Sequence, residues 1–177
     1  MAIGACLGAG RRPLTIVTGD GSLHCNLQEL LTIKYYRLPI KLFVYSNQGY
    51  GSIRTTQRSL FEGRLVGADP SSGVGCLDLK KLADLYDLEY AYIKNNDAIA
   101  EQVRHVKAAK KAVLCEVNLS PEQAISPKAS AFRRPDGTFE SRPLEDMAPF
   151  LPREEVAWNM HLFDESPAPE LTQLAMS

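Results

Sequence analysis

Two short runs of apolar and β-branched residues constrain the fold of this chain more than any other feature. They span residues 14–18 and 40–45, with a helix-length segment between them. Runs of this length predict buried strands, and a strand–helix–strand order predicts parallel pairing. The alternation continues, with helices expected at 77–86 and 96–109 and strands at 89–93 and 112–117. We therefore predict an α/β fold, a doubly wound and mostly parallel sheet with helices on both faces.

A polar sequence follows each of the first two strands at the point where the strand ends. Gly19-Asp20-Gly21-Ser22 follows the first strand, and Asn47 follows the second. The carboxyl ends of parallel strands meet at one edge of a sheet, which is where ligands bind in open α/β folds. Asp20 offers a charged oxygen, Asn47 a neutral one, and glycine lets a backbone carbonyl approach closely. Oxygen ligands of this kind suit Mg²⁺ that carries a diphosphate.

The segment between the two strands predicts an amphipathic helix from Ser22 to about Tyr36, with Ser22 as its N-cap. The free N–H groups and the positive dipole at the start of this helix favour phosphate. Each motif also has a plainer interpretation as a turn, because Asp hydrogen-bonds the following backbone and Gly supplies positive φ. Their joint spacing and placement favour the metal and diphosphate interpretation.

These residues resemble the diphosphate-binding signature of thiamine diphosphate-dependent enzymes. The phrase over residues 19–30, followed by Leu38-Pro39-Ile40-Lys41 and Ser46-Asn47-Gln48, is most similar to the acetolactate synthase large subunit and its relatives. The likeness covers residues 2–120 and is dense over 14–57. The family often has Asn-Asn where this chain has Ser46-Asn47, and the second Asn is the one that matches the metal ligand.

The resemblance implies thiamine diphosphate and Mg²⁺ as cofactors. It implies metal ligation by the side chains of Asp20 and Asn47 and by the carbonyl of Gly49. The implied cofactor-binding set is Gly19, Asp20, Gly21, Ser22, Asn47, Gly49, Tyr50 and Gly51. Arg54 and Gln57 are candidates for contacting substrate, because a guanidinium matches a carboxylate. The alternative for these two residues is a solvated loop.

No catalytic residue is expected on this chain by the same resemblance. Cofactor activation would need a glutamate from a pyrimidine-binding domain, on a partner chain in a homo- or hetero-oligomer. The implied substrates are 2-oxo acids, which undergo decarboxylation or carboligation. Residues 2–9 look like the later part of the first helix of such a domain, so we interpret the domain as incomplete at its N-terminus. The alternatives are a fragment of a larger enzyme, one subunit of a two-subunit 2-oxo acid decarboxylase, and a non-catalytic remnant.

Composition bears on the partners and the compartment. A net charge of −1 argues against nucleic acid or an anionic membrane as a partner. No apolar run approaches the roughly 20 residues of a membrane-spanning helix. Cys6, Cys25, Cys76 and Cys115 lack Cys-x-x-Cys spacing, and they predict reduced core thiols in a cytoplasmic protein. Cys25 and Cys115 fall in elements expected to be buried.

The regions outside the strand and helix pattern carry weaker predictions. Residues 48–76 predict a long loop with one short helix that reaches over the cofactor. Frequent prolines separate residues 120–177 from the domain at 1–119, and we predict an extended tail that packs on that domain or on a partner subunit. Within the tail, residues 132–137 predict an exposed turn, and 147–158 a docked helix or two apolar anchors.

Overall fold

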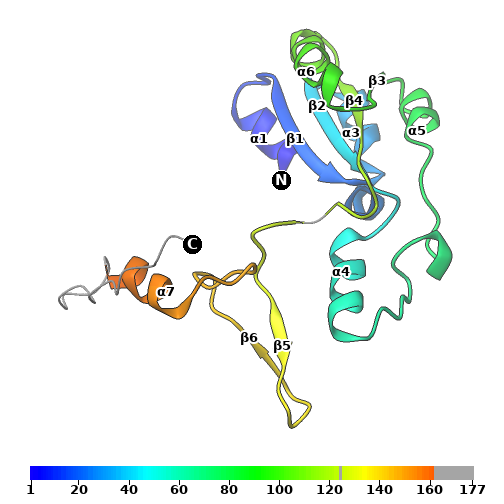
Figure 1. The fold of residues 1–177 in the computed structure, drawn as a ribbon. Coiled ribbons are helices and arrows are strands. Elements are labelled where there is room, and N and C mark those ends of the chain that lie inside the picture. The colour runs from blue at the N-terminus through cyan, green and yellow to red at the C-terminus, as the bar shows by residue number, and fades with distance from the viewer. Residues whose placement is uncertain (124, 162–177) are drawn as a thin grey trace. The chain divides into compact units, whose positions relative to one another are not determined.

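A computed structural model describes residues 1–123 and 125–161 of the chain (Figure 1). The chain divides into two compact units, residues 1–123 and 124–177. Residues 162–177 of the predicted tail lie outside the described part. Within the described ranges, every helix is too short or too polar to cross a membrane.

The first unit is built on a parallel sheet with the strand order β1-β2-β4-β3. Its strands are β1 (Leu14–Gly19), β2 (Ile40–Ser46), β3 (Glu89–Ile93) and β4 (Val113–Asn118). β1 pairs with β2 from Leu14↔Ile40 to Gly19↔Tyr45, so both strands end at the same edge of the sheet. The α/β class, the parallel sheet and all four strands predicted from the sequence are confirmed.

Helices cover both faces of the sheet (Figure 1), as predicted. One face packs against α1, α3 and α5 around leucines such as Leu30, Leu42 and Leu114. The other face packs against α6, where Val106 meets Phe43. Each fully buried leucine contributes about 1.5–3 kcal/mol relative to an exposed one. The helices are α1 (Ala2–Gly8), α2 (Asp20–Leu23), α3 (Glu29–Tyr35), α4 (Gly51–Leu60), α5 (Leu79–Leu85) and α6 (Ile99–Ala108), with 3₁₀-helices η1 (His24–Asn26), η2 (Pro70–Ser72) and η3 (Asn96–Ala98).

β1 is an edge strand, and the prediction that residues 14–18 are fully buried was wrong. Leu14 and Ile16 are partly buried against the α1 side, whereas Thr15 is exposed and Val17 is 57% exposed. The core beneath α6 takes residues of β2, β3 and β4 and none of β1. A strand covered on one face only alternates between buried and exposed side chains, which is what β1 shows.

Two predicted helix starts were also wrong. The helix after β1 begins at Asp20 with Gly19 as its N-cap, so Ser22 lies inside it and does not cap it. A turn of 3₁₀-helix, η1, then separates α2 from α3. Asn96 is the first residue of η3, and α6 begins only at Ile99. Capping residues mark a helix start only to within a few positions. The exact first residue depends on where the preceding strand ends.

The cysteines divide into two buried and two exposed thiols. Cys6 and Cys115 are buried, whereas Cys25 and Cys76 are exposed, so the prediction of a buried Cys25 was wrong. Cys25 lies in η1, whose three residues are not buried. All four thiols are free. Burial, with a smaller contribution from Glu116, raises the pKa of the Cys115 thiol to about 11.

This division predicts the order of alkylation by iodoacetamide at pH 8. The thiolate is the reactive form, and it must also be accessible. We therefore expect Cys25 and Cys76 to be modified in the folded chain, and Cys6 and Cys115 only after denaturation. Peptide mass spectrometry of native and denatured samples measures the four sites. Rapid labelling of Cys115 in the native chain would contradict the described core.

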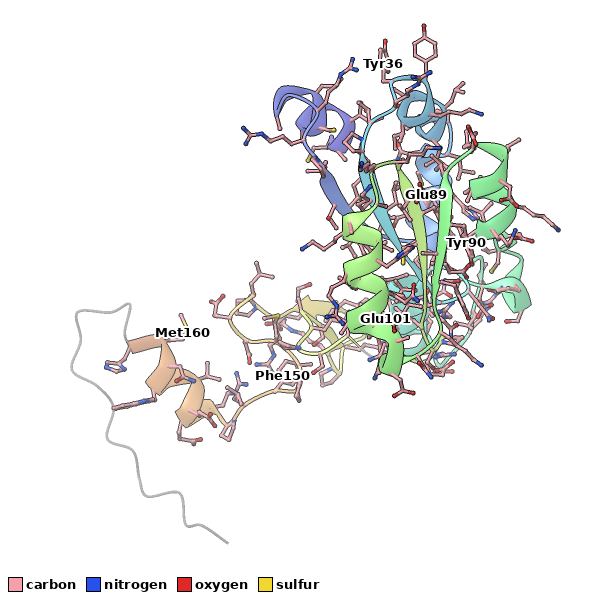
Figure 2. The ribbon with its side chains drawn as sticks, turned by 90° about the horizontal axis from the view of Figure 1, so that it is seen from above. Tyr36, Glu89, Tyr90, Glu101, Phe150 and Met160 are labelled. Carbon is pink, nitrogen blue, oxygen red and sulfur yellow. The ribbon has the colours of Figure 1, made fainter. Side chains whose placement is uncertain are left out.

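The second unit contains a short hairpin and one helix. β5 (Ala131–Arg133) pairs antiparallel with β6 (Phe139–Ser141), and α7 spans Arg153–Met160. The Gly137 N–H donates to the Arg134 carbonyl at 2.9 Å and closes the hairpin turn, as predicted for residues 132–137. Figure 2 labels Phe150, just before α7, and Met160, at the end of α7.

Ion pairs organise this second unit more than apolar burial does. Asp146 is 5% exposed and is the one buried side chain among those described in the unit. Arg153 donates to both of its carboxylate oxygens, at 2.7 and 2.8 Å, and Arg142 donates at 2.9 Å. These hydrogen bonds, Arg153 first, lower the pKa of the Asp146 carboxyl. A bidentate Arg–carboxylate pair therefore holds this part of the chain together.

Candidate functional site

The loop after β1 and the turn after β2 meet at the carboxyl edge of the sheet. Asp20 is the first residue of α2, and only 6% of its surface is exposed. Its Oδ1 accepts from the Gly21 N–H at 2.8 Å, and its Oδ2 accepts from the Gly49 N–H at 3.2 Å. The second hydrogen bond links two segments that are far apart in sequence. The predicted meeting of the Asp20 and Asn47 motifs in one place is confirmed.

The Asn47 side chain points at the same carboxylate. The amide atom of Asn47 that faces the site lies 3.2 Å from Asp20 Oδ1 and 2.9 Å from the Gly49 carbonyl oxygen. If this atom is nitrogen, it donates to both oxygens. If it is oxygen, three acceptors lie together without a donor, which is the arrangement that a cation stabilises. With its oxygen on this side, Asn47 adds a third oxygen beside those of Asp20 and Gly49.

The spacing of these three atoms fits Mg²⁺. Octahedral Mg²⁺ has ligand distances of 2.0–2.1 Å, so adjacent ligand oxygens lie about 2.9 Å apart. The distances of 2.9 and 3.2 Å around Asn47 are close to this value. The site offers one carboxylate, one amide and one carbonyl, and in the described part of the chain no cluster of three or more His, Cys, Asp or Glu side chains could hold a metal. A donor set this small leaves coordination positions for phosphate and water oxygens, as is usual for Mg²⁺.

Three glycines make this close approach possible. A Cβ on Gly21 would lie 2.6 Å from the Tyr50 ring, and a Cβ on Gly51 would lie 2.7 Å from the Asn47 amide nitrogen. Gly49 has φ +126°, and its Cβ would lie 2.5 Å from the Ala68 carbonyl oxygen. Backbone contacts therefore require glycine at Gly49, whereas a Cβ at Gly21 or Gly51 would displace the Tyr50 ring or the Asn47 amide.

Gly19 and Ser22 are placed differently from the rest of the predicted set. A Cβ on Gly19 would meet nothing within 4 Å, so packing does not require glycine there. Ser22 lines a cavity of about 240 Å³ together with Ile3, Ile16 and Leu42. Asp20, Gly21 and Gly49 line a different pocket.

The pocket beside Asp20 also contains residues outside the predicted cofactor-binding set. His24 and the backbone segment 74–76 line it together with Asp20 and Gly49. The segment belongs to the long loop predicted at 48–76, which therefore does reach the site. Burial, followed by the charge of Asp20, raises the pKa of the Cys76 thiol. Nothing in the local pattern marks Cys76, because its place depends on the fold of the whole loop.

Arg54 and Gln57 have partners inside the first unit, which the substrate hypothesis did not anticipate. Arg54 is 2% exposed and donates to the backbone carbonyls of Asn47, Gln48 and Pro121. Both ends of the Gln57 amide bond to the backbone of Val66, at 2.9 and 3.0 Å. These contacts favour an internal role for both side chains over contact with a substrate.

The fold and this group of atoms define a class of protein. A parallel α/β domain with a carboxylate, an amide and a carbonyl at the carboxyl edge of its sheet is a cofactor-binding domain for a metal-linked phosphate group. Residues 1–117 match the model of the family described as thiamine pyrophosphate enzyme, C-terminal TPP binding domain. The chain belongs to this family. The cofactor predicted from the sequence, thiamine diphosphate (thiamine pyrophosphate), is the one that defines it.

Individual relatives are similar to this chain at modest identity. An acetolactate synthase large subunit from Cyanidium caldarium is 30% identical over 105 residues, which are 59% of this chain and 18% of the relative. An acetolactate synthase from Arthrospira platensis is 24% identical over 126 residues, 71% of this chain and 21% of the relative. A benzoylformate decarboxylase from Pseudomonas aeruginosa is 32% identical over 127 residues, which are 71% of this chain and 22% of the relative. The chain thus spans about a fifth of the length of these relatives.

Proposed function

We propose that this chain is the Mg²⁺–thiamine diphosphate anchor of an enzyme that acts on 2-oxo acids. The position of the Asn47 amide, 3.2 Å from the Asp20 carboxylate and 2.9 Å from the Gly49 carbonyl oxygen, supports this proposal most directly. The family match supports the same cofactor. The similarity to acetolactate synthases supports decarboxylation or carboligation as the reaction.

Each of the three residues has a distinct role in this proposal. Asp20 supplies the only negative charge among the three ligands, and its two backbone hydrogen bonds fix the direction of its oxygens. Asn47 and Gly49 supply neutral oxygens, so the negative charge of the diphosphate completes the neutralisation of Mg²⁺. When bound, thiamine diphosphate supplies the chemistry that cleaves or forms a carbon–carbon bond next to a carbonyl. The contribution of this chain is to bind and orient.

The partner side of the proposal follows from the resemblance. Activation of the cofactor requires a glutamate from a pyrimidine-binding domain, so we propose a homo- or hetero-oligomer in which a partner supplies it. The chain alone would then bind cofactor without turning over a 2-oxo acid. A cytoplasmic location fits the reduced thiols expected there.

The similarity to a benzoylformate decarboxylase supports a second candidate. The benzoylformate decarboxylase aligns over 71% of this chain, so decarboxylation without carboligation is the alternative reaction. In that case the chain would serve as the diphosphate-binding subunit of a two-subunit 2-oxo acid decarboxylase. Product analysis after reconstitution with a pyrimidine-binding partner separates an aldehyde product from a 2-hydroxy-2-alkyl acid.

Calorimetric titration of thiamine diphosphate into the purified chain tests the proposal. The titration is run with Mg²⁺ and again with a chelator. Binding that requires Mg²⁺ would support the anchor. Lack of binding by a folded chain in the presence of Mg²⁺ would refute a complete site on this chain.

A substitution at Gly51 is expected to weaken Mg²⁺ binding and to leave the fold intact. The Cβ of Gly51→Ala would lie 2.7 Å from the Asn47 amide, which is the end of a flexible side chain and can move away. Gly51 is the first residue of α4, where alanine is a good helix former. We therefore expect an unchanged melting temperature and an apparent Mg²⁺ affinity about tenfold weaker. Thermal denaturation and Mg²⁺ titration at fixed thiamine diphosphate measure the two quantities, and a matching loss of stability would contradict this interpretation.

A further inference from the structure

Arg54 is a buried cation next to the candidate metal ligands. It lies in the first turns of α4 with 2% of its surface exposed. Its Nε–H makes no hydrogen bond to any described residue. A buried donor left unpaired is unfavourable, so the other contacts of this guanidinium must offset that loss.

The remaining nitrogens of the guanidinium bind three backbone carbonyls. Nη2 donates to Asn47 O at 2.8 Å and to Pro121 O at 3.2 Å, and Nη1 donates to Gln48 O at 3.0 Å. We call Arg54 and these three carbonyls the Arg54 clamp. It joins α4, the turn after β2 and the segment that follows β4.

The backbone carbonyls of the turn after β2 point in two different directions. The carbonyls of Asn47 and Gln48 point at Arg54, whereas the Gly49 carbonyl points at the Asn47 side chain. The turn needs unusual backbone angles to achieve this, with φ +61° at Gln48 and +126° at Gly49. The left-handed region is disfavoured for a residue with a Cβ, so Gln48 needs an external contact to stay there. The hydrogen bond from Arg54 to the Gln48 carbonyl is such a contact.

We propose that Arg54 is a positioning residue of the metal site. By binding the carbonyls of Asn47 and Gln48, it fixes the turn so that the Asn47 amide lies beside both the Asp20 carboxylate and the Gly49 carbonyl. Arg54 acts on the metal through these groups and does not touch it. The inference rests on the proposed function, because it assigns Arg54 a part in Mg²⁺ binding, and it replaces the substrate hypothesis for this residue.

The first test compares Arg54→Met and Arg54→Lys with Arg58→Met in the full chain. Arg58 lies one turn further along α4, is 42% exposed and pairs with Glu122, so it controls for loss of an arginine from this helix. Amide hydrogen exchange is measured on the ligand-free protein at Gly49 and Tyr50. We expect exchange about tenfold faster in Arg54→Met, intermediate in Arg54→Lys and unchanged in Arg58→Met.

The second test measures the Mg²⁺ dependence of thiamine diphosphate binding in the same variants. Loss of a residue that orients a metal ligand weakens metal affinity by about 10- to 100-fold, and we expect this range for Arg54→Met. Arg54→Lys should retain part of the affinity, because a lysine can hold one carbonyl. A merely structural role would lower the melting temperature without changing the Mg²⁺ requirement of the folded protein.

The outcomes distinguish this inference from the proposed function. Unchanged exchange at Gly49 and Tyr50 in both Arg54 variants would overturn the clamp, whether or not the chain binds cofactor. Faster exchange with unaltered Mg²⁺ affinity would overturn its role at the metal. Absence of Mg²⁺-dependent binding by the wild-type chain would refute the proposed function instead, and the exchange experiment still tests the clamp. If Arg54→Met does not fold, amide exchange and Mg²⁺ dependence are both measured on Arg54→Lys.

Discussion

Replacing Asp20 with alanine is expected to abolish Mg²⁺-dependent binding of thiamine diphosphate. Asp20 is the one charged ligand of the candidate site, and it also holds the Gly21 and Gly49 amides. The substitution removes the ligand and the two hydrogen bonds that fix the turn. Since loss of an indirect partner already weakens metal binding by about 10- to 100-fold, loss of this ligand should exceed 100-fold. Calorimetric titration with and without Mg²⁺ measures the change.

Two further substitutions make the Asp20 result specific. Asp78→Ala is the matched control, because the Asp78 carboxylate also accepts a backbone N–H, from Lys81 at 2.9 Å, but caps α5 instead. It should lower stability by about 0.5–2 kcal/mol and leave binding unchanged. Asp20→Asn keeps the shape of the side chain and removes its charge. The Mg²⁺-dependent affinity of this variant for thiamine diphosphate should therefore lie between the affinities of Asp20→Ala and Asp78→Ala. Wild-type binding by a folded Asp20→Ala chain would refute the site.

Replacing Gly49 with alanine is expected to give the largest loss of stability among substitutions in the turn. Its Cβ would lie 2.5 Å from the Ala68 carbonyl oxygen and 3.1 Å from the Asp69 Cα, and both are backbone atoms that cannot rotate away. The φ of +126° is also unfavourable for alanine. Together these effects should lower the free energy of unfolding by roughly 2–4 kcal/mol. Urea denaturation followed by circular dichroism measures it.

The Gly63→Ala variant shows how much of the stability loss in Gly49→Ala comes from the steric contact with Ala68 and Asp69. Gly63 also has positive φ, +79°, but a Cβ there would meet nothing within 4 Å. This control should therefore lose only the backbone preference, about 1–2 kcal/mol. The difference between Gly49→Ala and Gly63→Ala measures the clash with Ala68 and Asp69. Equal losses in the two variants would mean that the turn relaxes away from this backbone contact.

Local sequence was sufficient for the elements and for the position of the site. The apolar runs predicted all four strands of the parallel sheet, because strands of parallel sheets are rich in apolar and β-branched residues even where one face is exposed. Because parallel strands end at a common edge, Asp20 and Asn47 could be placed together without coordinates. The same patterns placed helix starts less well, and Ser22 and Asn96 were both wrong as N-caps.

The surroundings of individual side chains depended on long-range packing. A sequence cannot say that β1 is an edge strand, so Val17 was expected to be buried and is 57% exposed. Arg54 was predicted to contact substrate, with a solvated loop as the alternative, but it is buried and donates to the carbonyl of Pro121, which is remote in sequence. The place of segment 74–76 in the pocket beside Asp20 likewise depends on the path of the whole loop.

By itself, the sequence determined the α/β class, the parallel order of strands and helices, the cofactor family and the pair of side chains at the carboxyl edge. The fold class and the pair of side chains follow from periodicity and from short motifs, which act over a few residues. The cofactor family follows from the resemblance of those motifs to thiamine diphosphate-dependent enzymes. Only the tertiary structure decided that the Gly49 carbonyl points at the Asn47 amide, why glycine is required at Gly49, and that Arg54 points inward. The physical reason is that a hydrogen bond or a steric contact between distant segments depends on distances that only the complete packing fixes.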